Sequence, residues 1–337
     1  MTLVNANRQI LLRARPEGLA GPEHFAESSV PVEQPGPGEA LLESLYISID
    51  PAMRTWITEN PGYVPSVQIG AVMRAGGVAR VLESRIEGLR PGDLVQGRLG
   101  WQSHPTLPAS ALQKLDLSLG TAEDWIGPLG TSALTAYFGM TVVGDVRPGN
   151  TVLVSGSAGA VGQIAAQVAK LMHCRVIGIA GGPDKCAFLK EALSLDEALD
   201  YKSTDDLAAA IANVADGGID VFFDNVGGRT LEAAIQNMRV GGRIALCGRI
   251  SQTTAPVPYG VKNLGLAIGK RIRMQGFIVS DFHDQYSHAR AWLAGELASG
   301  RLTQRLHILE GLEKAPEGLR MLFTGENFGK LAVKISH

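Results

Sequence analysis

Three glycines, each three residues from the next, could bring backbone amides against a phosphate group. Gly156, Gly159 and Gly162 follow an apolar, β-branched run at 152–154 and precede a segment with apolar residues at helical spacing. This pattern predicts a strand, a tight turn and a helix, whose first N–H groups are left unpaired for an anion such as a pyrophosphate. Because the spacing is not the usual G-x-G-x-x-G, a glycine-lined helix start without a ligand stays open at this point.

The tip of the next strand bears on which dinucleotide would bind. NAD-specific proteins place a carboxylate there to accept hydrogen bonds from the ribose 2′-hydroxyl. Here Gly181 and Gly182 leave an open pocket, and Lys185 supplies a cation that suits a 2′-phosphate. Asp184 is expected to cap the following helix instead, because it comes directly after Pro183. The sequence therefore favours NADP(H) over NAD(H).

Two later turns could hold the nicotinamide half of the same cofactor. Residues 224–228 (DNVGG) and 247–251 (CGRIS) each end an apolar, strand-like run with glycine and a short polar side chain. Plain turn chemistry would explain either turn alone. Two of them on successive strands favour a binding site.

These turns need a sheet to position them, and the pattern from residue 150 onward predicts one. Strand-like and helical stretches alternate, which indicates β-α-β units, a doubly wound parallel sheet and a ligand crevice at the carboxyl ends of the strands. We expect strands at 151–154, 176–179, 220–223, 243–246 and 274–279. We expect helices at 161–172, 184–193, 205–214, 230–238, 261–268 and 286–297.

The rest of the chain has the pattern of a smaller β domain. Short β-type runs at 9–13, 39–49, 77–83 and 93–98 are separated by Pro-Gly turns, which suits a partly open barrel. A helical stretch at 313–326 and an alternating strand at 329–335 end the chain, and that strand is expected to return to the first sheet because a lone strand needs a partner. We predict residues 1–125, completed by 310–337, as this domain, and residues 126–309 as the dinucleotide-binding domain.

Composition narrows the function classes. The 337 residues are 45% hydrophobic and 19% charged with a net charge near −2, which gives no argument for a nucleic acid or membrane partner and favours small molecules. The first residues alternate and carry arginines, unlike a signal peptide, so we expect a cytoplasmic protein. Three scattered cysteines, Cys174, Cys186 and Cys247, predict neither a disulfide framework nor a metal site.

Several longer motifs, spread over nearly the whole chain, carry a family resemblance. They are DPAMR (50–54), QIG-x-VMRAGGVARV (68–81), LTAYFG (134–139), VSGSAGAVG (154–162), FFDNVGG (222–228), CGRIS (247–251), QGFIV (275–279) and ENFGK (326–330). With these motifs the chain resembles the zinc-free branch of the medium-chain dehydrogenase/reductase superfamily. More narrowly, it resembles the NADPH-dependent alkenal, prostaglandin and curcumin double-bond reductases, also called the leukotriene B4 dehydrogenase group. The resemblance implies a GroES-like β-barrel domain, a Rossmann domain and a homodimer.

The resemblance also implies which residues bind the cofactor. Ala158, Gly159, Ala160, Val161 and Gly162 would lie under the pyrophosphate, and Lys185 and Tyr201 would hold the 2′-phosphate. The ribose and nicotinamide would be lined by Asn225, Cys247, Gly248, Ile250, Ser251, Thr253, Phe277, Ile278, Val279 and Asn327.

The sequence departs from the family where the substrate would bind. A tyrosine usually follows the CG-x-IS turn within two residues and meets the substrate carbonyl, whereas this chain has Gln252 and Thr253. Thr253 can still donate a hydrogen bond, and Tyr259 is a second candidate, although a packed loop tyrosine explains it as well. Ala52 replaces the tyrosine of the family's DPYMR motif. Thr253 and Tyr259 are therefore the predicted catalytic residues.

The expected reaction is hydride addition to the β-carbon of an α,β-unsaturated aldehyde or ketone, with donors stabilising the enolate oxygen. A zinc-independent NADPH:quinone oxidoreductase and a non-catalytic NADPH-binding protein stay open as alternatives. A zinc alcohol dehydrogenase is disfavoured because no cysteine precedes Cys174 in the chain.

Overall fold

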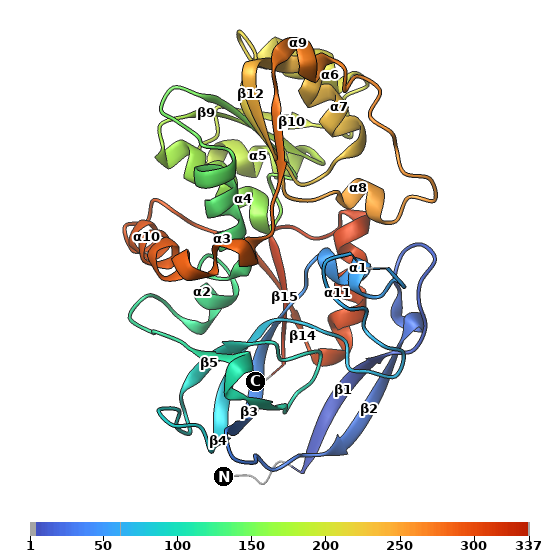
Figure 1. Cartoon of the computed structure of the whole chain (residues 1–337), viewed down its shortest axis with the longest axis vertical. Coiled ribbons are helices and arrows are strands. Elements are labelled where there is room, and N and C mark those ends of the chain that lie inside the picture. The colour runs from blue at the N-terminus through green and yellow to red at the C-terminus, as the bar shows by residue number, and fades with distance from the viewer. Residues whose placement is uncertain (1–4, 61, 336–337) are drawn as a thin grey trace. The chain divides into compact units, whose positions relative to one another are not determined.

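The computed structural model describes residues 5–60 and 62–335, which form two compact units (Figure 1). The first unit contains the chain up to Ile126, Leu306–Asn327 and the segment from Leu331 onward. The second contains Gly127–Arg305 and Phe328–Lys330. Within the described residues, no helix is both long and apolar enough to cross a membrane.

Most of the strand pairs in the first unit are antiparallel. A two-stranded sheet pairs β1 (Ala6–Leu12) with β2 (Phe25–Pro31). The larger sheet runs in the order β14 (Leu306–Glu310), β15 (Lys330–Lys334), β3 (Glu39–Ser48), β4 (Gly77–Ser84), β5 (Leu94–Gly97) and β7 (Leu112–Lys114), with β6 (Thr106–Pro108) also on β3. Its helices are η1 (Pro22–His24), α1 (Ala52–Trp56), η2 (Ala109–Ala111), α2 (Ala122–Ile126), η5 (Leu312–Lys314) and α11 (Ala315–Thr324).

The predicted return of the terminal strand is confirmed. In β15, Val333 is paired with Ile47 of β3 in an antiparallel register, and Leu331 and Val333 are buried in the core of this unit. Four strands were missed by the sequence analysis: β2, β6, β7 and β14. None of them is a buried apolar run: β2 has one buried residue out of seven and the other three have none.

The second unit contains a six-stranded sheet whose strands are all parallel. The order is β10 (Glu197–Asp200), β9 (Arg175–Ala180), β8 (Thr151–Ser155), β11 (Ile219–Asp224), β12 (Met238–Leu246) and β13 (Arg273–Gly276). This is the strand order of dinucleotide-binding sheets, with the change of direction between β8 and β11. The predicted doubly wound parallel sheet is therefore confirmed.

The helices of this unit lie before, between and after these strands in the chain. They are α3 (Thr131–Phe138), η3 (Gly139–Val143), α4 (Ala160–Leu171), α5 (Pro183–Glu191), α6 (Leu207–Val214), α7 (Gly228–Asn237), α8 (Ile250–Thr253), α9 (Leu266–Lys270), η4 (Val279–Gln285) and α10 (Tyr286–Ala298). Three predicted elements of this unit had limits wrong by three or more residues. The strand expected at 274–279 ends at Gly276, the helix expected at 261–268 begins only at Leu266, and the strand expected at 243–246 begins already at Met238. Strand β10 was missed because none of its four residues is fully buried.

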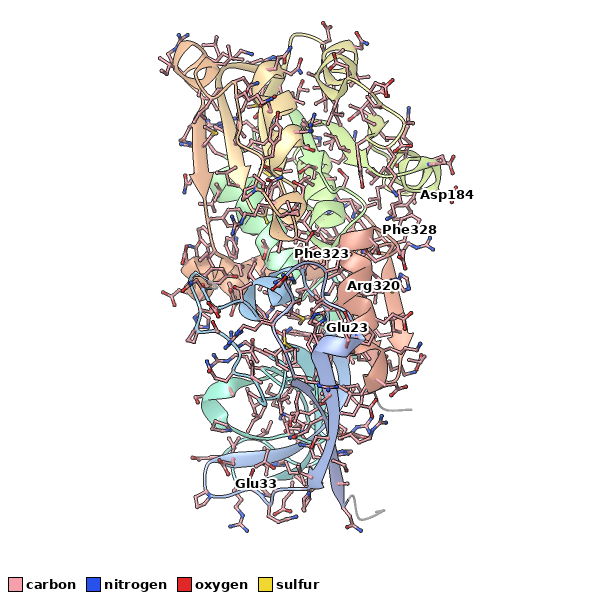
Figure 2. All side chains as sticks on the ribbon, turned by 90° about the vertical axis from the view of Figure 1, so that its right-hand side faces the viewer. Glu23, Glu33, Asp184, Arg320, Phe323 and Phe328 are labelled. Atoms are coloured by element: carbon pink, nitrogen blue, oxygen red, sulfur yellow. The ribbon has the colours of Figure 1, made fainter. Side chains whose placement is uncertain are left out.

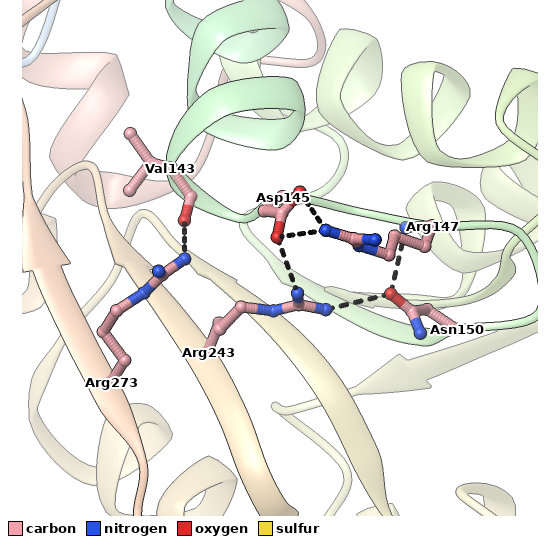
Figure 3. A network of polar contacts seen from close by, with 6 residues as sticks. All are labelled: Val143, Asp145, Arg147, Asn150, Arg243 and Arg273. Carbon is pink, nitrogen blue, oxygen red and sulfur yellow. Dashed lines mark hydrogen bonds and ion pairs between the residues drawn. The ribbon is translucent and has the colours of Figure 1, made fainter.

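A polar network fixes the end of this sheet that lies away from the predicted site (Figure 3). Arg243 of β12 donates to the Asp145 carboxylate and to the Asn150 side-chain oxygen, each at 3.1 Å, and Arg273 of β13 donates to the Val143 carbonyl at 3.3 Å. These bonds join the connection after η3 to strands far away in the sequence. We infer that they hold the strands in register, so that their carboxyl ends meet.

Candidate functional site

The glycine turn lies between β8 and α4, as the spacing predicted. Gly156 has a φ of +60°, which suits glycine, and Gly159 is the residue that caps α4. A Cβ on Gly162 would overlap the Gly156 carbonyl oxygen and lie 2.7 Å from the Ser157 Cα, so the helix can approach the strand only with glycine here. No side chain caps the first turn of α4. Its N–H groups, at Ala160, Val161 and Gly162, are therefore left for an anion.

A buried carboxylate joins the ends of β8 and β11. Asp224 Oδ1 accepts the Ser155 hydroxyl at 3.0 Å and the backbone N–H groups of Val226 and Gly227 at 2.9 Å each. Asp224 is fully buried, and burial raises the pKa of its carboxyl despite these bonds, while Oδ2 has no partner. Ser155 also accepts the Asn225 N–H at 2.8 Å, and the Asn225 side-chain amide donates to the Ser155 carbonyl at 2.7 Å.

The two predicted nicotinamide turns lie against each other. The N–H groups of Cys247 and Gly248 both donate to the Asp224 carbonyl at 2.9 Å, and Ser251 donates to the Val226 carbonyl through its hydroxyl at 2.7 Å. A Cβ on Gly248 would lie 3.0 Å from the Asn225 carbonyl oxygen. Burial raises the pKa of the Cys247 thiol to about 12, so this cysteine stays protonated and is not a nucleophile.

Lys185 and Tyr201 border the Gly181–Gly182 turn at the tip of β9. The Tyr201 ring packs on Gly181, where a Cβ would lie 2.8 Å from the ring, and a Cβ on Gly182 would meet nothing within 4 Å. Burial, with a smaller contribution from Lys202, lowers the pKa of the half-buried Lys185 ammonium. The turn thus has open space and cationic neighbours, as a 2′-phosphate would require.

Asp184 does not act as the sequence suggested. Helix α5 does begin at Pro183, with Asp184 in its first turn, but the structure gives the Asp184 carboxylate no capping hydrogen bond among the described residues. Asp200 of the missed strand β10 takes part instead, since its Oδ1 accepts the N–H groups of Gly182 at 2.8 Å and Lys202 at 2.9 Å. The expected cap at Asp184 was therefore wrong.

The two predicted catalytic hydroxyls are both engaged within this unit. Thr253, in the last turn of α8, donates to the Arg249 carbonyl at 3.2 Å. Tyr259 donates to Glu232 Oε1 at 2.9 Å, with the side chains of Arg229 and Lys262 over its ring. The Glu232 carboxylate raises the pKa of the Tyr259 hydroxyl. The roles of Thr253 and Tyr259 toward a substrate stay predictions.

The remaining predicted cofactor residues come from two places. Phe277 packs edge-on against Phe223 and lies beside Gly139, where a Cβ would be 2.5 Å from its ring. Ile278 N–H donates to Asp281 Oδ2 at 3.4 Å, and Val279 begins η4. Asn327 belongs to the first unit, so its predicted contact with the cofactor stays a prediction.

The sequence did not indicate the contacts that Phe328 and Gly329 make with the rest of the second unit. Gly329 N–H donates to the Ala158 carbonyl at 3.1 Å, which pairs the terminal segment with the glycine turn. Phe328 packs edge-on against Phe188 of α5, close to the first turn that carries Asp184 (Figure 2). The ENFGK motif marked this segment but did not indicate its contacts.

Two family models match parts of this chain. The family model described as "N-terminal domain of oxidoreductase" matches residues 8–115, and the one described as "Zinc-binding dehydrogenase" matches residues 160–295. The part of the chain that the structure describes has no cluster of three or more His, Cys, Asp or Glu residues that could hold a metal ion.

Relatives that match over the whole chain identify the family more narrowly than the two family models do. The chain is 36% identical to the NADPH-dependent curcumin reductase of Escherichia coli (strain K12), over 98% of this chain and 97% of the relative. It is 37% identical to the 2-alkenal reductase (NADP(+)-dependent) of Nicotiana tabacum, over 98% of each. The crystal structure of CurA in complex with NADPH from Vibrio vulnificus matches with a TM-score of 0.93 and 37% identity, covering 98% of this chain and 99% of that one. The chain belongs to the zinc-free medium-chain dehydrogenase/reductase superfamily and, within it, to the NADPH-dependent alkenal, prostaglandin and curcumin double-bond reductases.

Proposed function

We propose that this protein is an NADPH-dependent reductase of the carbon–carbon double bond of α,β-unsaturated aldehydes and ketones. The observation that carries the proposal is the glycine turn at the switch point of the parallel sheet, with Lys185 and Tyr201 at the tip of the neighbouring strand. Relatives that are similar over 98% of the chain and are named for curcumin and 2-alkenal reduction support it.

The residues present fit NADPH. Gly162 lets α4 approach β8 closely, α4 begins with uncapped N–H groups, and the Gly182 turn is open beside a lysine. Ala158 to Gly162 would hold the pyrophosphate, Lys185 and Tyr201 the 2′-phosphate, and Asn225 with the turn from Cys247 to Ser251 the nicotinamide half. When bound, NADPH supplies a hydride.

This chain's part in the reaction is to stabilise charge on the substrate oxygen. A carbonyl oxygen gains negative charge as the β-carbon is reduced, and a hydrogen-bond donor aimed at it lowers the barrier. We propose Thr253 for this role, because its present hydrogen bond to the Arg249 carbonyl is long, at 3.2 Å. Tyr259 would first have to give up the Glu232 carboxylate, which makes it the second candidate.

The activity has a direct test. Purified protein with NADPH and an enone such as 3-nonen-2-one should oxidise NADPH and form the saturated ketone. The same measurement with 1,4-benzoquinone should give slower turnover. Faster turnover on the quinone would favour the quinone reductase alternative. Tight NADPH binding without oxidation by any enal, enone or quinone would contradict the enzyme assignment.

We further infer that the protein forms a homodimer in the cytoplasm through the edge of the six-stranded sheet. Strand β13 ends that sheet, and Leu264, Leu266 and Ile268 near it are 51%, 41% and 82% exposed. An unpaired edge strand beside exposed apolar side chains is a typical protein interface. Sedimentation equilibrium should give twice the chain mass, and Ile268→Asp should shift it toward the monomer. A monomeric wild-type protein would contradict the dimer.

A further inference from the structure

Arg305 stacks on an aromatic ring beside the proposed cofactor site. Its guanidinium carbon lies 4.1 Å from the centre of the Phe328 ring, and the Lys185 ammonium lies 5.9 Å from the same ring centre. The Phe328 ring also packs edge-on against Phe188, with centroids 5.1 Å apart. One aromatic ring is therefore contacted by an arginine and by the lysine that was predicted to bind the 2′-phosphate.

The backbone of Arg305 is connected to the glycine turn by hydrogen bonds through the side chain of Gln163. Its N–H donates to the side chain of Gln163 at 2.9 Å, and Gln163, buried in the first turns of α4, donates to the Ala158 carbonyl at 3.1 Å. Its carbonyl accepts the Lys330 N–H at 2.9 Å. Gly329, with a φ of +96°, allows this approach, because a Cβ there would overlap the Arg305 carbonyl oxygen. Arg305 is thus held in place relative to the turn.

The charge around Arg305 and Lys185 is positive. The Arg305 side chain is exposed and makes no ion pair with a carboxylate in residues 5–60 or 62–335. Lys202 is close enough to Lys185 to lower the pKa of its ammonium. The acids on the segments next to Lys185 are Asp184, in the first turn of α5, and Asp200, whose Oδ1 accepts two backbone N–H groups. Arg305, Lys185 and Lys202 together give this region a positive charge, which favours a multiply charged anion.

We propose that Arg305 is a specificity-determining residue that binds the 2′-phosphate of NADPH together with Lys185. This rests on the proposed function. A guanidinium offers several donors in a planar fork that matches phosphate, and stacking on Phe328 fixes the fork before the ligand arrives. The 2′-phosphate is the group that distinguishes NADPH from NADH, so Arg305 acts on the choice of cofactor.

The test measures binding by calorimetry with two fragments, 2′,5′-ADP and 5′-ADP, which differ only in the 2′-phosphate. Arg305→Met keeps an apolar side chain on Phe328 and removes the charge. This variant should lower the affinity for 2′,5′-ADP by about tenfold or more and change the affinity for 5′-ADP by less than about twofold. Lys185→Ala should show the same selective loss. Arg301→Met is the matched control, because Arg301 pairs with Glu296 and should leave both affinities unchanged.

The outcomes separate the two proposals. If Lys185→Ala loses the preference for 2′,5′-ADP over 5′-ADP but Arg305→Met keeps it, the role of Arg305 is overturned while the NADPH proposal stands. Equal losses for both fragments in Arg305→Met would also overturn it, since they would indicate a merely structural arginine. If Arg305→Met fails to fold, Phe328→Leu serves instead, and selectivity unchanged from wild type would overturn the proposal. Wild-type protein that binds neither 2′,5′-ADP nor NADPH would overturn both.

Discussion

Gly162→Ala is expected to weaken NADPH binding by about 100-fold or more and to lower the free energy of unfolding by about 1–3 kcal/mol. The added Cβ overlaps the Gly156 carbonyl oxygen and lies 2.7 Å from the Ser157 Cα. Both obstacles are backbone, so α4 must move away from β8 and carry its first N–H groups with it. Calorimetry with NADPH and urea denaturation measure the two effects.

Gly295→Ala, in another helix of the same unit, is the control for Gly162→Ala. Gly295 is inside α10, where a Cβ would meet nothing within 4 Å. Gly295→Ala should therefore leave NADPH binding unchanged and raise the free energy of unfolding by about 0.5–1 kcal/mol, since alanine loses less backbone entropy in a helix. A Gly162→Ala protein that binds NADPH within about threefold of wild type would show that α4 need not approach the strand so closely.

The parallel sheet and its glycine turn could be predicted because their signals are local. Residues 151–155 are all buried, as in a strand covered on both faces, and such strands are continuous apolar runs in the sequence. The turn after β8 needs glycine at Gly156 because of its positive φ and at Gly162 because a Cβ would overlap backbone atoms. These physical requirements act within a dozen residues, so they are visible in one sequence.

The contacts that were missed join distant segments. Asp200 rather than Asp184 accepts the Gly182 N–H, and the strand that carries Asp200 has no buried residue to mark it. Gly329 contacts Ala158, some 170 residues away in the sequence, through a backbone hydrogen bond, and Phe328 contacts the ring of the similarly distant Phe188. No periodicity or spacing encodes such a pairing. Family motifs marked the segment, and only the fold gave its partners.

The structural role of Asp224 is another feature that could not be predicted from the sequence. The DNVGG motif indicated a turn for the cofactor, with Asn225 as the binding residue. The structure shows that Asp224 builds the turn, because its Oδ1 accepts three donors from two strand ends and its backbone carbonyl accepts two more from the Cys247–Gly248 turn. A carboxylate that is fully buried without a cation could not be inferred from its neighbours in the chain.

Asp224→Ala is expected to lower the free energy of unfolding by about 3 kcal/mol or more, because it leaves three buried donors without an acceptor at about 1–3 kcal/mol each. Asp224→Asn keeps an amide oxygen for them and should lose less than half as much. NADPH affinity should fall in the same order, since both nicotinamide turns depend on this residue. Urea denaturation and calorimetry at neutral pH measure both effects.

The pH dependence distinguishes the charge of Asp224 from its hydrogen bonds. Burial raises the pKa of this carboxyl above its ordinary value of 3.8, so the folded protein binds the proton more tightly than the unfolded chain. The resulting stabilisation is present below the unfolded pKa and is lost as the pH rises through the raised pKa. The free energy of unfolding of wild type minus that of Asp224→Asn should therefore fall as the pH rises above 3.8, with the other carboxyls cancelling in the difference. A difference that is flat, or that rises with pH, would mean that Asp224 is not a carboxyl whose charge is disfavoured in the folded protein.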